Sequence, residues 1–331
     1  DAVVLFSSSA DNGLNEIIQD FITGPGIQLD RVVFRSGIEF EFLAVSFDDL
    51  SSGYTHNLAS VASQVTFQQG DIRDRAALER LMAGVDYVLH QAAIPSVVKS
   101  VEEPAVTHDV NINGTFNVLD VARLAGVKRV VFAGSSAVYG NSPVLPKVET
   151  MVPAPLSPYA LHKATGEAYG KLFSELYGFE VVTLRYFNVF GPQQDPKSDY
   201  AAVIPKFITR MLAGQRVTIF GDGTQTRDFC HIDNVVEANL LACTSPGAAG
   251  HSFNIACGER ISLTDLVDRL NLVLGTQLAP EFAAPRAGDI AHSMADIGAA
   301  RRGLGFDPAV DVTEGLARTV AWYRARAGRT A

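Results

Sequence analysis

Short apolar runs alternate with amphipathic helical patterns through the first half of the chain. The apolar runs have the length of buried strands, and the longer segments between them repeat their apolar positions with the period of a helix. The predicted strands are Val85–His90, Val130–Ala133 and Val181–Arg185, and the predicted helices are Asn113–Ala125 and Tyr159–Tyr177. This alternation predicts an α/β fold with a doubly wound, Rossmann-like parallel sheet that carries helices on both faces.

The composition changes after Gly191, where the run Pro192-Gln193-Gln194-Asp195-Pro196 is typical of a linker. We therefore expect a sheet domain over residues 1–190 and a smaller mixed α/β lobe over residues 191–331, with a segment near 226–243 returning to the sheet domain. The lobe is predicted to contain helices at Ala202–Ala213, Thr264–Leu274 and Thr313–Arg326 and short strands near Thr218–Phe220 and Ser252–Ile255.

The charge of the chain restricts its partners. A formal net charge of −9 over 331 residues argues against binding to nucleic acid or to an anionic membrane surface. A phosphate-containing ligand must therefore be bound by a few local arginines and backbone amides. The 47% of hydrophobic residues is enough for the core of an ordinary globular protein.

The cysteines and the apolar runs indicate the compartment. Cys230, Cys243 and Cys257 have neither C-x-x-C spacing nor a neighbouring histidine cluster, so a reduced, cytoplasmic location and no metal site are expected. The run Ala2–Phe6 is too short for a signal peptide. No stretch approaches the ~20 apolar residues that a membrane span needs, so no membrane partner is expected.

The candidate chemistry lies at Tyr159 and Lys163. Four residues apart, they share one face of a predicted helix, and an ammonium beside a phenol favours the phenolate. The pair alone is common on exposed helix faces. Ser135, however, follows a predicted buried strand and brings a hydroxyl toward the same place. Together the three residues predict a proton-transfer site.

These residues stand among ordered motifs that resemble the extended short-chain dehydrogenase/reductases, and within them the UDP-sugar 4-epimerases of the UDP-N-acetylglucosamine or UDP-glucose type. The resemblance extends from about Phe47 to the C-terminus. The motifs are Asp48-Asp49-Leu50-Ser51-Ser52-Gly53, Gly70-Asp71-Ile72-Arg73, His90-Gln91-Ala92-Ala93, Asn111-Ile112-Asn113-Gly114-Thr115, Leu184-Arg185-Tyr186-Phe187-Asn188-Val189-Phe190-Gly191, Gly221-Asp222-Gly223, Arg227-Asp228-Phe229 and Arg286-Ala287-Gly288-Asp289.

The resemblance implies an isomerase with a tightly bound NAD. Tyr159 as phenolate removes the proton from the C4 hydroxyl of the sugar, and hydride passes from C4 to the nicotinamide. The 4-keto sugar turns and takes the hydride back on its other face. Lys163 lowers the pKa of the tyrosine and holds the nicotinamide ribose, while Ser135 hydrogen-bonds the reacting oxygen. Such products typically supply polysaccharide biosynthesis.

The resemblance also assigns residues to the cofactor. Asp48 closes the second predicted strand, where an acidic side chain binds the adenosine ribose hydroxyls and favours NAD over NADP. The remaining cofactor residues that it implies are Asp71, Ile72, Gln91, Ala92, Ala93, Tyr159, Lys163 and Tyr186.

The glycine fingerprint of the family, Thr-Gly-x-x-Gly-x-x-Gly, is missing from the first strand–helix turn. Thr23-Gly24 lies at an acceptable distance before Asp48, but the next two required glycines fall on Ile27 and Asp30. Gly24 and Gly26 are therefore the candidates for approach to the pyrophosphate.

A different alignment takes Val3–Phe6 as the first strand and supplies only the last glycine, Gly13, after a longer connection. Because an incomplete loop weakens dinucleotide binding, a cofactor-impaired protein that still binds nucleotide sugars is the alternative from another class.

On the substrate side, the resemblance implies that Arg227 and Arg286 bind the diphosphate, since guanidinium groups match phosphate oxygens in pairs. Asn188 hydrogen-bonds the diphosphate or sugar and disfavours a uronic acid. The other substrate residues are a uracil sandwich of Ala202 and Val203 against Thr218, Ile219 and Phe220, the ribose ligand Asp289, and the sugar-side residues Ser96, Ser135, Ser136, Tyr159 and Ser293.

The residue at position 293 predicts which sugar the enzyme uses. Relatives restricted to UDP-glucose and UDP-galactose carry a bulky tyrosine at this position, whereas serine leaves room for a C2 acetamido group. The chain is therefore predicted to interconvert UDP-GlcNAc and UDP-GalNAc, with UDP-glucose and UDP-galactose as the alternative pair. UDP-glucuronate epimerisation is a further alternative. A sugar-nucleotide dehydratase is another, but it needs an Asp-Glu pair where Ser136 and Ala137 stand.

A homodimer is expected as well. Asn113–Ala125 and Tyr159–Tyr177 match the helices that relatives pair across a two-fold axis as a four-helix bundle. Leu119, Val121, Leu172 and Leu176 make these helices more apolar than one buried face requires.

Overall fold

The computed structural model describes residues 2–6, 27–28, 31–33, 39–40, 43–51, 53–59, 61–63, 65–196, 202–285 and 291–327, with side chains from Ala44 onward. It confirms an α/β fold. Seven of the described strands form one parallel sheet in the order β14-β9-β8-β7-β1-β5-β6. These strands are β1 (Ala2–Phe6), β5 (Leu43–Asp48), β6 (Val65–Gln69), β7 (Tyr87–His90), β8 (Arg129–Ser135), β9 (Glu180–Tyr186) and β14 (Ser252–Ile255).

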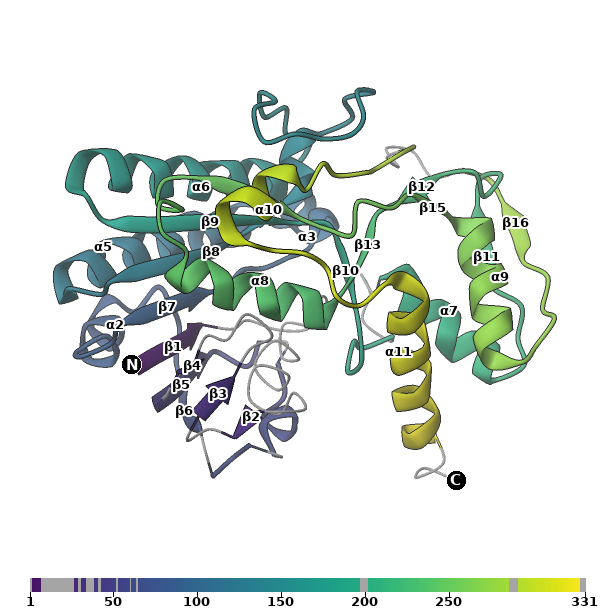
Figure 1. Cartoon of the computed structure of the whole chain (residues 1–331), viewed down its shortest axis with the longest axis horizontal. Helices are drawn as coiled ribbons and strands as arrows, with labels where there is room; N and C mark the ends of the chain where they lie inside the picture. The colour runs from purple at the N-terminus through teal and green to yellow at the C-terminus, as the bar shows by residue number, and fades with distance from the viewer. Residues whose placement is uncertain are drawn as a thin grey trace.

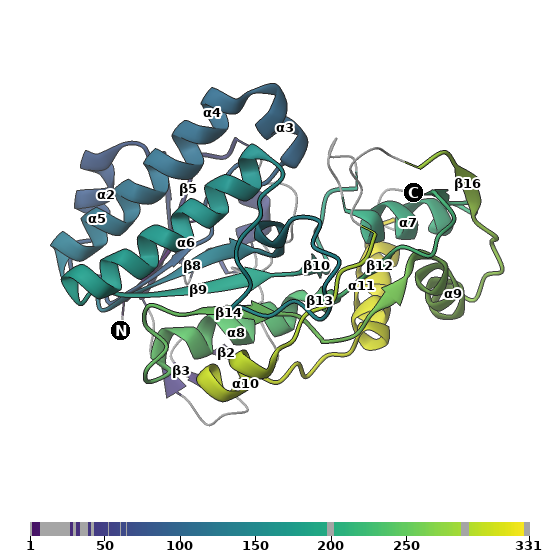
Figure 2. The same ribbon diagram turned by 90° about the horizontal axis from the view of Figure 1, so that it is seen from above.

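Helices cover both faces of this sheet (Figures 1 and 2). One apolar core, which includes Leu78, Val118 and Phe173, joins one face of the sheet to three helices. A second core, which includes Val235, Leu241 and Leu304, joins the other face to two helices. The first three helices are α2 (Arg75–Leu81), α5 (Thr115–Ala125) and α6 (Pro158–Tyr177), and the other two are α8 (Ile232–Thr244) and α10 (Gly298–Leu304).

The strand order reverses between β1 and β7. From β1 the chain builds outward through β5 and β6 and then crosses to β7, β8 and β9 on the other side. In doubly wound sheets, the carboxyl ends of the strands at such a point border the crevice that binds a dinucleotide. The fold therefore places a cofactor crevice beside the ends of β1 and β7.

The pairing of β1 with both β5 and β7 confirms Val3–Phe6 as the first strand of the sheet. Residues 7–26, which follow this strand, lie outside the described residues. The candidates Gly24 and Gly26 are among them.

Helix α6 begins and ends where its sequence directs. Ser157 accepts a hydrogen bond from the Ala160 amide at 3.2 Å, Pro158 occupies the first turn, and Gly178 closes the helix at φ 62°. A Cβ on Gly166 would lie 2.5 Å from the Phe132 ring, so only glycine lets α6 pack this closely on β8. The close packing fixes the first turns of α6 against the end of the sheet.

Helix α5 continues from other helical segments without a break. α4 (Pro104–His108) and a π-helical turn, η2 (Asp109–Gly114), lead directly into it, whereas Glu103 separates them from α3 (Val97–Glu102). The predicted start at Asn113 therefore falls inside a longer helical stretch, where the Asn113 side chain donates to Asp109 at 2.9 Å and does not cap a helix. The helix ends at Gly126 with φ 77°, as the C-cap pattern predicts.

The C-terminal lobe has an apolar core of its own, which includes Phe207, Leu266 and Leu316. It lies beyond the carboxyl ends of the sheet strands (Figure 2). Its helices are α7 (Val203–Leu212), α9 (Leu263–Leu274) and α11 (Val312–Ala327). Its strands pair as β10 (Asn188–Phe190) with β13 (Phe229–His231), β11 (Thr218–Phe220) with β16 (Glu281–Ala283), and β12 (Thr226–Arg227) with β15 (Ile261–Ser262).

The structure corrects one part of the expected division. Residues 226–243 return to the sheet domain as α8, which packs against β8 and β9, but their strand β13 pairs with β10 in the lobe. The strand that joins the main sheet is β14, which was expected in the lobe. An apolar run such as Ser252–Ile255 does not specify its partner strand, so the sequence pattern alone does not place it.

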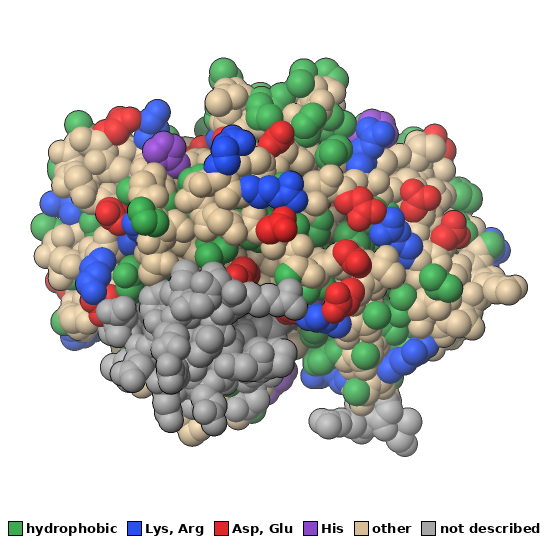
Figure 3. Space-filling model, viewed as in Figure 1, with side chains coloured by type: hydrophobic (Ala, Val, Ile, Leu, Met, Phe, Trp, Pro, Cys, Tyr) green, Lys and Arg blue, Asp and Glu red, His purple; other side chains and the backbone are tan. Residues whose placement is uncertain are grey.

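The surface in Figure 3 mixes acidic and basic side chains on the face shown. Apolar side chains gather on the projecting loop between η3 (Ser136–Tyr139) and α6, where Val144, Val152 and Leu156 are exposed. Within the described residues, no helix has both the length and the apolar character of a membrane span.

Candidate active site

A cavity of about 500 Å³ opens between the sheet domain and the lobe. Fourteen of the residues proposed from the sequence line it. The sheet domain contributes Gln91, Ala93, Ser135, Ser136, Tyr159, Lys163 and Tyr186, which we call the sheet wall. The segment after β9 contributes Asn188, Ala202, Val203, Thr218, Ile219, Phe220 and Arg227, which we call the lobe wall.

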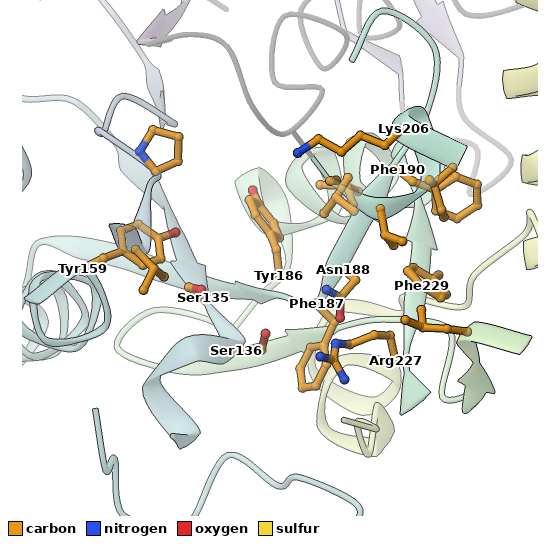
Figure 4. A pocket seen from close by; sticks show the side chains of 18 of the residues that line it. Ser135, Ser136, Tyr159, Tyr186, Phe187, Asn188, Phe190, Lys206, Arg227 and Phe229 are labelled. Carbon is orange, nitrogen blue, oxygen red and sulfur yellow. The ribbon is translucent and has the colours of Figure 1, made fainter. Parts of the chain in front are cut away.

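Tyr159 lies in the first turn of α6 and is only 8% exposed. Its backbone amide donates to the Ser100 hydroxyl at 3.0 Å, which ties this turn to α3. Burial raises the pKa of the Tyr159 phenol, and a hydrogen bond with Ser135 opposes that rise. In Figure 4 the phenol and the Ser135 hydroxyl both face the cavity.

Lys163 lies one turn further along the same helix face and is 5% exposed. Its ammonium donates to the Ala133 carbonyl oxygen at 2.8 Å and lies 5.2 Å from the centre of the Phe132 ring. Burial lowers the pKa of Lys163 to about 7. The amine is therefore balanced between its two protonation states near neutral pH, where an added negative charge in the cavity favours the ammonium.

The relation between these two residues differs from the simple expectation. The sequence suggests that Lys163 directly lowers the pKa of Tyr159. In the structure, the opposing interaction at Tyr159 comes from Ser135, while the ammonium of Lys163 is directed to the backbone of β8. Helical spacing predicts that both side chains lie on one face of the helix, but it does not predict the hydrogen-bond partner of each.

Ser135 ends β8 in an extended conformation, and its hydroxyl accepts from the Ala137 amide at 3.2 Å. This bond begins the single turn η3 and holds the Ser135 side chain at the sheet edge. The next two residues, Ser136 and Ala137, carry no ionisable group. This part of the sheet wall therefore lacks the acid–base pair that elimination of water from a sugar requires.

A buried polar triad supports the sheet wall behind Tyr186. The Tyr186 hydroxyl lies 3.0 Å from Asn239 Oδ1, and Gln91 Nε2 donates to the same oxygen at 3.0 Å. Asn239 Nδ2 donates to the Val235 carbonyl at 2.7 Å, which fixes the amide orientation. Sequence reasoning missed Asn239. The available signal was an amide at a core position of an apolar helix, where a polar group needs a partner.

The lobe wall is built from short segments (Figure 4). Asn188 opens β10, two residues after β9 ends at Tyr186. Arg227 extends from β12 and donates from Nη1 to the Thr226 carbonyl at 2.9 Å. Lys206 on α7 also lines the cavity and was missed, although a lysine in the apolar run Val203-Ile204-Pro205-Lys206-Phe207 is unusual enough to notice.

Asp48, Asp71 and Ile72, which were proposed for the cofactor, lie outside this cavity. The Asp48 carboxylate, 3% exposed at the end of β5, accepts from the Leu50 amide at 2.6 Å. Asp71 pairs with Arg73 at 2.6 Å, and this hydrogen bond lowers the pKa of Asp71. Ile72 is buried in the core under α2 and α5.

Three further proposed residues, Ala92, Ser96 and Ser293, are not part of the cavity lining. Ala92 is buried beside Ala93. Ser96 caps α3 by accepting from the Lys99 amide at 3.0 Å. The Ser293 amide donates to the Thr226 carbonyl at 3.0 Å, so Ser293 flanks the strand that carries Arg227. Arg286 and Asp289 lie outside the described residues.

The residues at the switch point suit NAD. Asp48 ends β5, the strand beside β1 on the side away from β7. Its carboxylate is placed to accept hydrogen bonds from ribose hydroxyls. Small side chains, Ala92 and Ala93, follow β7 and permit close approach of a flat ring. Lys163 provides a cation at the end of the crevice where the nicotinamide ribose is expected. Among the described residues, no cluster of three metal-ligating side chains is present.

The family model described as "NAD dependent epimerase/dehydratase family" matches residues 43–256. The chain belongs to this family. Its members' cofactor, NAD, is therefore the cofactor of this chain, and the enzyme is of the UDP-sugar 4-epimerase type among the extended short-chain dehydrogenase/reductases, as the sequence predicts.

Three relatives illustrate the match. A putative UDP-glucose 4-epimerase of Methanocaldococcus jannaschii is 39% identical over 289 residues, which cover 87% of this chain and 92% of the relative. The structure of a UDP-N-acetylglucosamine 4-epimerase from Methanobrevibacter ruminantium, in complex with UDP-N-acetylmuramic acid, is 35% identical with a TM-score of 0.87 and 98% of each chain covered. A UDP-glucose 4-epimerase of Thermus thermophilus, in complex with NAD, is 32% identical with a TM-score of 0.81, covering 98% of this chain and 99% of the other.

Proposed function

We propose that this enzyme interconverts UDP-GlcNAc and UDP-GalNAc by inverting the configuration at C4 of the sugar. One observation carries the C4 chemistry: Ser135, Tyr159 and Lys163 lie on one wall of a cavity whose other wall offers Arg227 and an apolar pocket. The first wall suits proton transfer at a sugar hydroxyl, and the second suits a nucleotide diphosphate.

When bound, NAD supplies a positively charged ring that accepts a hydride from C4 of the sugar and returns it to the opposite face. Tyr159 as phenolate takes the proton from the C4 hydroxyl and later gives it back. Ser135 donates a hydrogen bond to the reacting oxygen. Because burial raises the pKa of Tyr159, the phenolate needs stabilisation: the hydrogen bond with Ser135 supplies it directly, and Lys163 adds a positive charge one turn away on the same helix face.

The nucleotide lies along the lobe wall in this proposal. The start of α7, with Ala202 and Val203, faces Thr218–Phe220 of β11 across the cavity, and the two segments hold the uracil ring between backbone amides and apolar side chains. Arg227 and Asn188 then bind the diphosphate. The catalytic groups of the sheet wall lie beyond Asn188, where the sugar is expected.

The choice of sugar rests on one residue that lines the cavity and on one outside the lining that the resemblance assigns to the C2 substituent. Ser136 on the cavity wall and Ser293 beside β12 are small and carry hydroxyl groups, which leaves room and hydrogen-bond partners for an acetamido group. A relative named as a UDP-N-acetylglucosamine 4-epimerase shares this fold over nearly its whole length. UDP-glucose and UDP-galactose are the alternative pair, since relatives named as UDP-glucose 4-epimerases are equally similar.

Two other substrate classes are disfavoured by specific residues. A 4,6-dehydratase needs ionisable groups where Ser136 and Ala137 stand. A UDP-glucuronate 4-epimerase is disfavoured because relatives that act on UDP-glucuronate tend to carry threonine at the position of Asn188.

The test compares both sugar pairs on one enzyme. Purified protein is incubated with UDP-GlcNAc or UDP-glucose, and the epimers are separated by chromatography. We expect a higher kcat/KM for UDP-GlcNAc. The Ser293→Tyr variant should lose at least about tenfold of that activity and keep its activity on UDP-glucose, since excluding a substituent is worth ~1–3 kcal/mol.

Ser293→Ala serves as the matched control and should retain both activities. Turnover of UDP-glucose alone by the wild type contradicts the proposed sugar. Absence of bound nicotinamide in the absorbance spectrum, together with no turnover, favours the cofactor-impaired binding protein.

We also propose a homodimer formed through α5 and α6. Leu119 and Val121 are buried in the chain's own core, but Leu172 and Leu176 are 48% and 65% exposed, and Leu124 is 62% exposed. These exposed leucines lie on two helices that pack against each other, so they suit a four-helix contact with a second copy.

The variant Leu176→Glu should shift the protein from dimer to monomer at micromolar concentration in analytical ultracentrifugation, because a charge would be buried in the contact. Leu272→Glu makes the same change at a 78% exposed position of α9 and should leave the mass unchanged. A monomeric wild type contradicts this proposal.

A further inference from the structure

A second cation faces the cavity from the lobe wall. Lys206 lies in the second turn of α7, where its neighbours Ile204, Phe207 and Ile208 are buried in the core of the lobe. Its own side chain is half-buried and lines the cavity. In Figure 4 the ammonium of Lys206 and the guanidinium of Arg227 lie on opposite sides of the Asn188 amide.

The setting of Lys206 calls for an anionic ligand. The adjoining cavity positions of α7 are apolar, namely Val203 and Phe207. Among the residues that the structure describes, none forms an ion pair or hydrogen bond with Lys206. Since the chain as a whole is acidic, with a net charge of −9, an anion in this cavity must be held by cations at its walls.

We propose that Lys206 binds the diphosphate of the nucleotide sugar from the side opposite Arg227. The substrate must run from the apolar pocket at Thr218–Phe220 to Tyr159, so the diphosphate that joins its two ends passes Asn188. Each phosphoryl group carries a negative charge there. One charge is matched by a guanidinium from β12 and the other by an ammonium from α7.

This inference rests on the proposed function, because it takes a nucleotide diphosphate as the occupant of the cavity. The pyrophosphate of NAD offers the same chemistry, so the experiment must separate the two sources. UDP is a suitable probe, since it contains the diphosphate and the base but undergoes no reaction at C4.

The experiment measures UDP binding to the holoenzyme by isothermal titration calorimetry, together with the NAD content of each preparation. Lys206→Met keeps the apolar stem of the side chain and removes the charge. We expect its Kd for UDP to rise about tenfold, the value of one charge-assisted hydrogen bond, while NAD content stays unchanged. Lys206→Arg should stay within about threefold of the wild type.

Lys128→Met is the matched control, because Lys128 is an exposed lysine paired with Asp86, outside the cavity lining. Its UDP affinity should not change. If Lys206→Met does not fold, as judged by its thermal transition, Lys206→Gln takes its place with the same expected tenfold loss.

The outcomes separate this inference from the proposed function. Wild-type protein that binds UDP together with a Lys206→Met variant that binds it equally well overturns the role of Lys206 and leaves the proposed function standing. A variant that loses NAD but keeps its UDP affinity also overturns it, because the lysine then serves the cofactor. Wild-type protein that does not bind UDP contradicts the proposed function itself.

Discussion

The two walls of the cavity are built in different ways. Tyr159, Lys163 and Gln91 of the sheet wall are each less than a tenth exposed. The first two lie on the long helix α6, and Gln91 directly follows β7, an inner strand of the seven-stranded sheet. Asn188 and Arg227 of the lobe wall are more exposed and come from strands of two or three residues. The difference suggests that the fold holds the proton-transfer groups rigidly, while the sugar nucleotide is selected by side chains that are easily exchanged.

The strongest test of this division is Tyr159→Phe. Removing only the ionisable oxygen should lower kcat by about 10³-fold, the usual scale for loss of a general acid–base group, while UDP affinity and NAD content stay close to wild type. Steady-state kinetics and calorimetry on the same preparation measure both effects. Turnover within tenfold of the wild type would show that another group carries the proton.

The matching change on the lobe wall is Arg227→Met. We expect KM for the UDP-sugar to rise about 10- to 100-fold with kcat nearly unchanged, because the lost contact binds ground state and transition state alike. Arg216→Met is a suitable control, since Arg216 binds the Ala279 and Pro280 carbonyls on the outside of the lobe. A fall in kcat as large as the rise in KM would contradict the assignment of binding to the lobe wall and of proton transfer to the sheet wall.

The third effect acts on stability, not on turnover, and concerns the sheet wall and its dependence on pH. Burial lowers the pKa of Lys163 from 10.5 to about 7, so between these values the unfolded chain binds the proton that the folded chain has released. Its contribution to stability therefore rises with pH through this window, by about 1.4 kcal/mol per pH unit at most, and falls as the pH drops toward 7.

Thermal denaturation of protein freed of NAD, compared between the wild type and Lys163→Met, isolates this contribution. The melting temperature of the wild type should gain on that of the variant as the pH is raised from about 7 to 10. A difference that stays constant across this range would show that Lys163 keeps its charge in the folded protein.

Local patterns in the sequence predicted that Ser135, Tyr159 and Lys163 come together. The four-residue spacing of Tyr159 and Lys163 and the strand that ends at Ser135 are local features, and the structure places all three on one wall. The short strand Thr218–Phe220 has the predicted bounds. Each of these predictions depends only on neighbours along the chain.

What the sequence did not reveal depends on contacts between distant segments. Asn239 meets Tyr186 and Gln91 only after α8 folds back onto the sheet. The addition of β14 to the main sheet follows from topology, not from its own apolar run. Likewise, periodicity showed that Leu119 and Leu172 are both apolar helix positions, but not that only the first is buried by its own chain.

One extended segment joins the two walls. Strand β9 ends at Tyr186, Phe187 donates its amide to the Ile255 carbonyl, and β10 begins at Asn188, whose amide donates to the Asp228 carbonyl. Two residues of extended chain span roughly 6–7 Å, so covalent geometry sets the separation between the reacting end of the site and its diphosphate end. An insertion here would shift every group on one wall relative to the other. We therefore expect variants of this enzyme with a changed sugar specificity to differ in the side chains of the cavity and to keep the length of this segment.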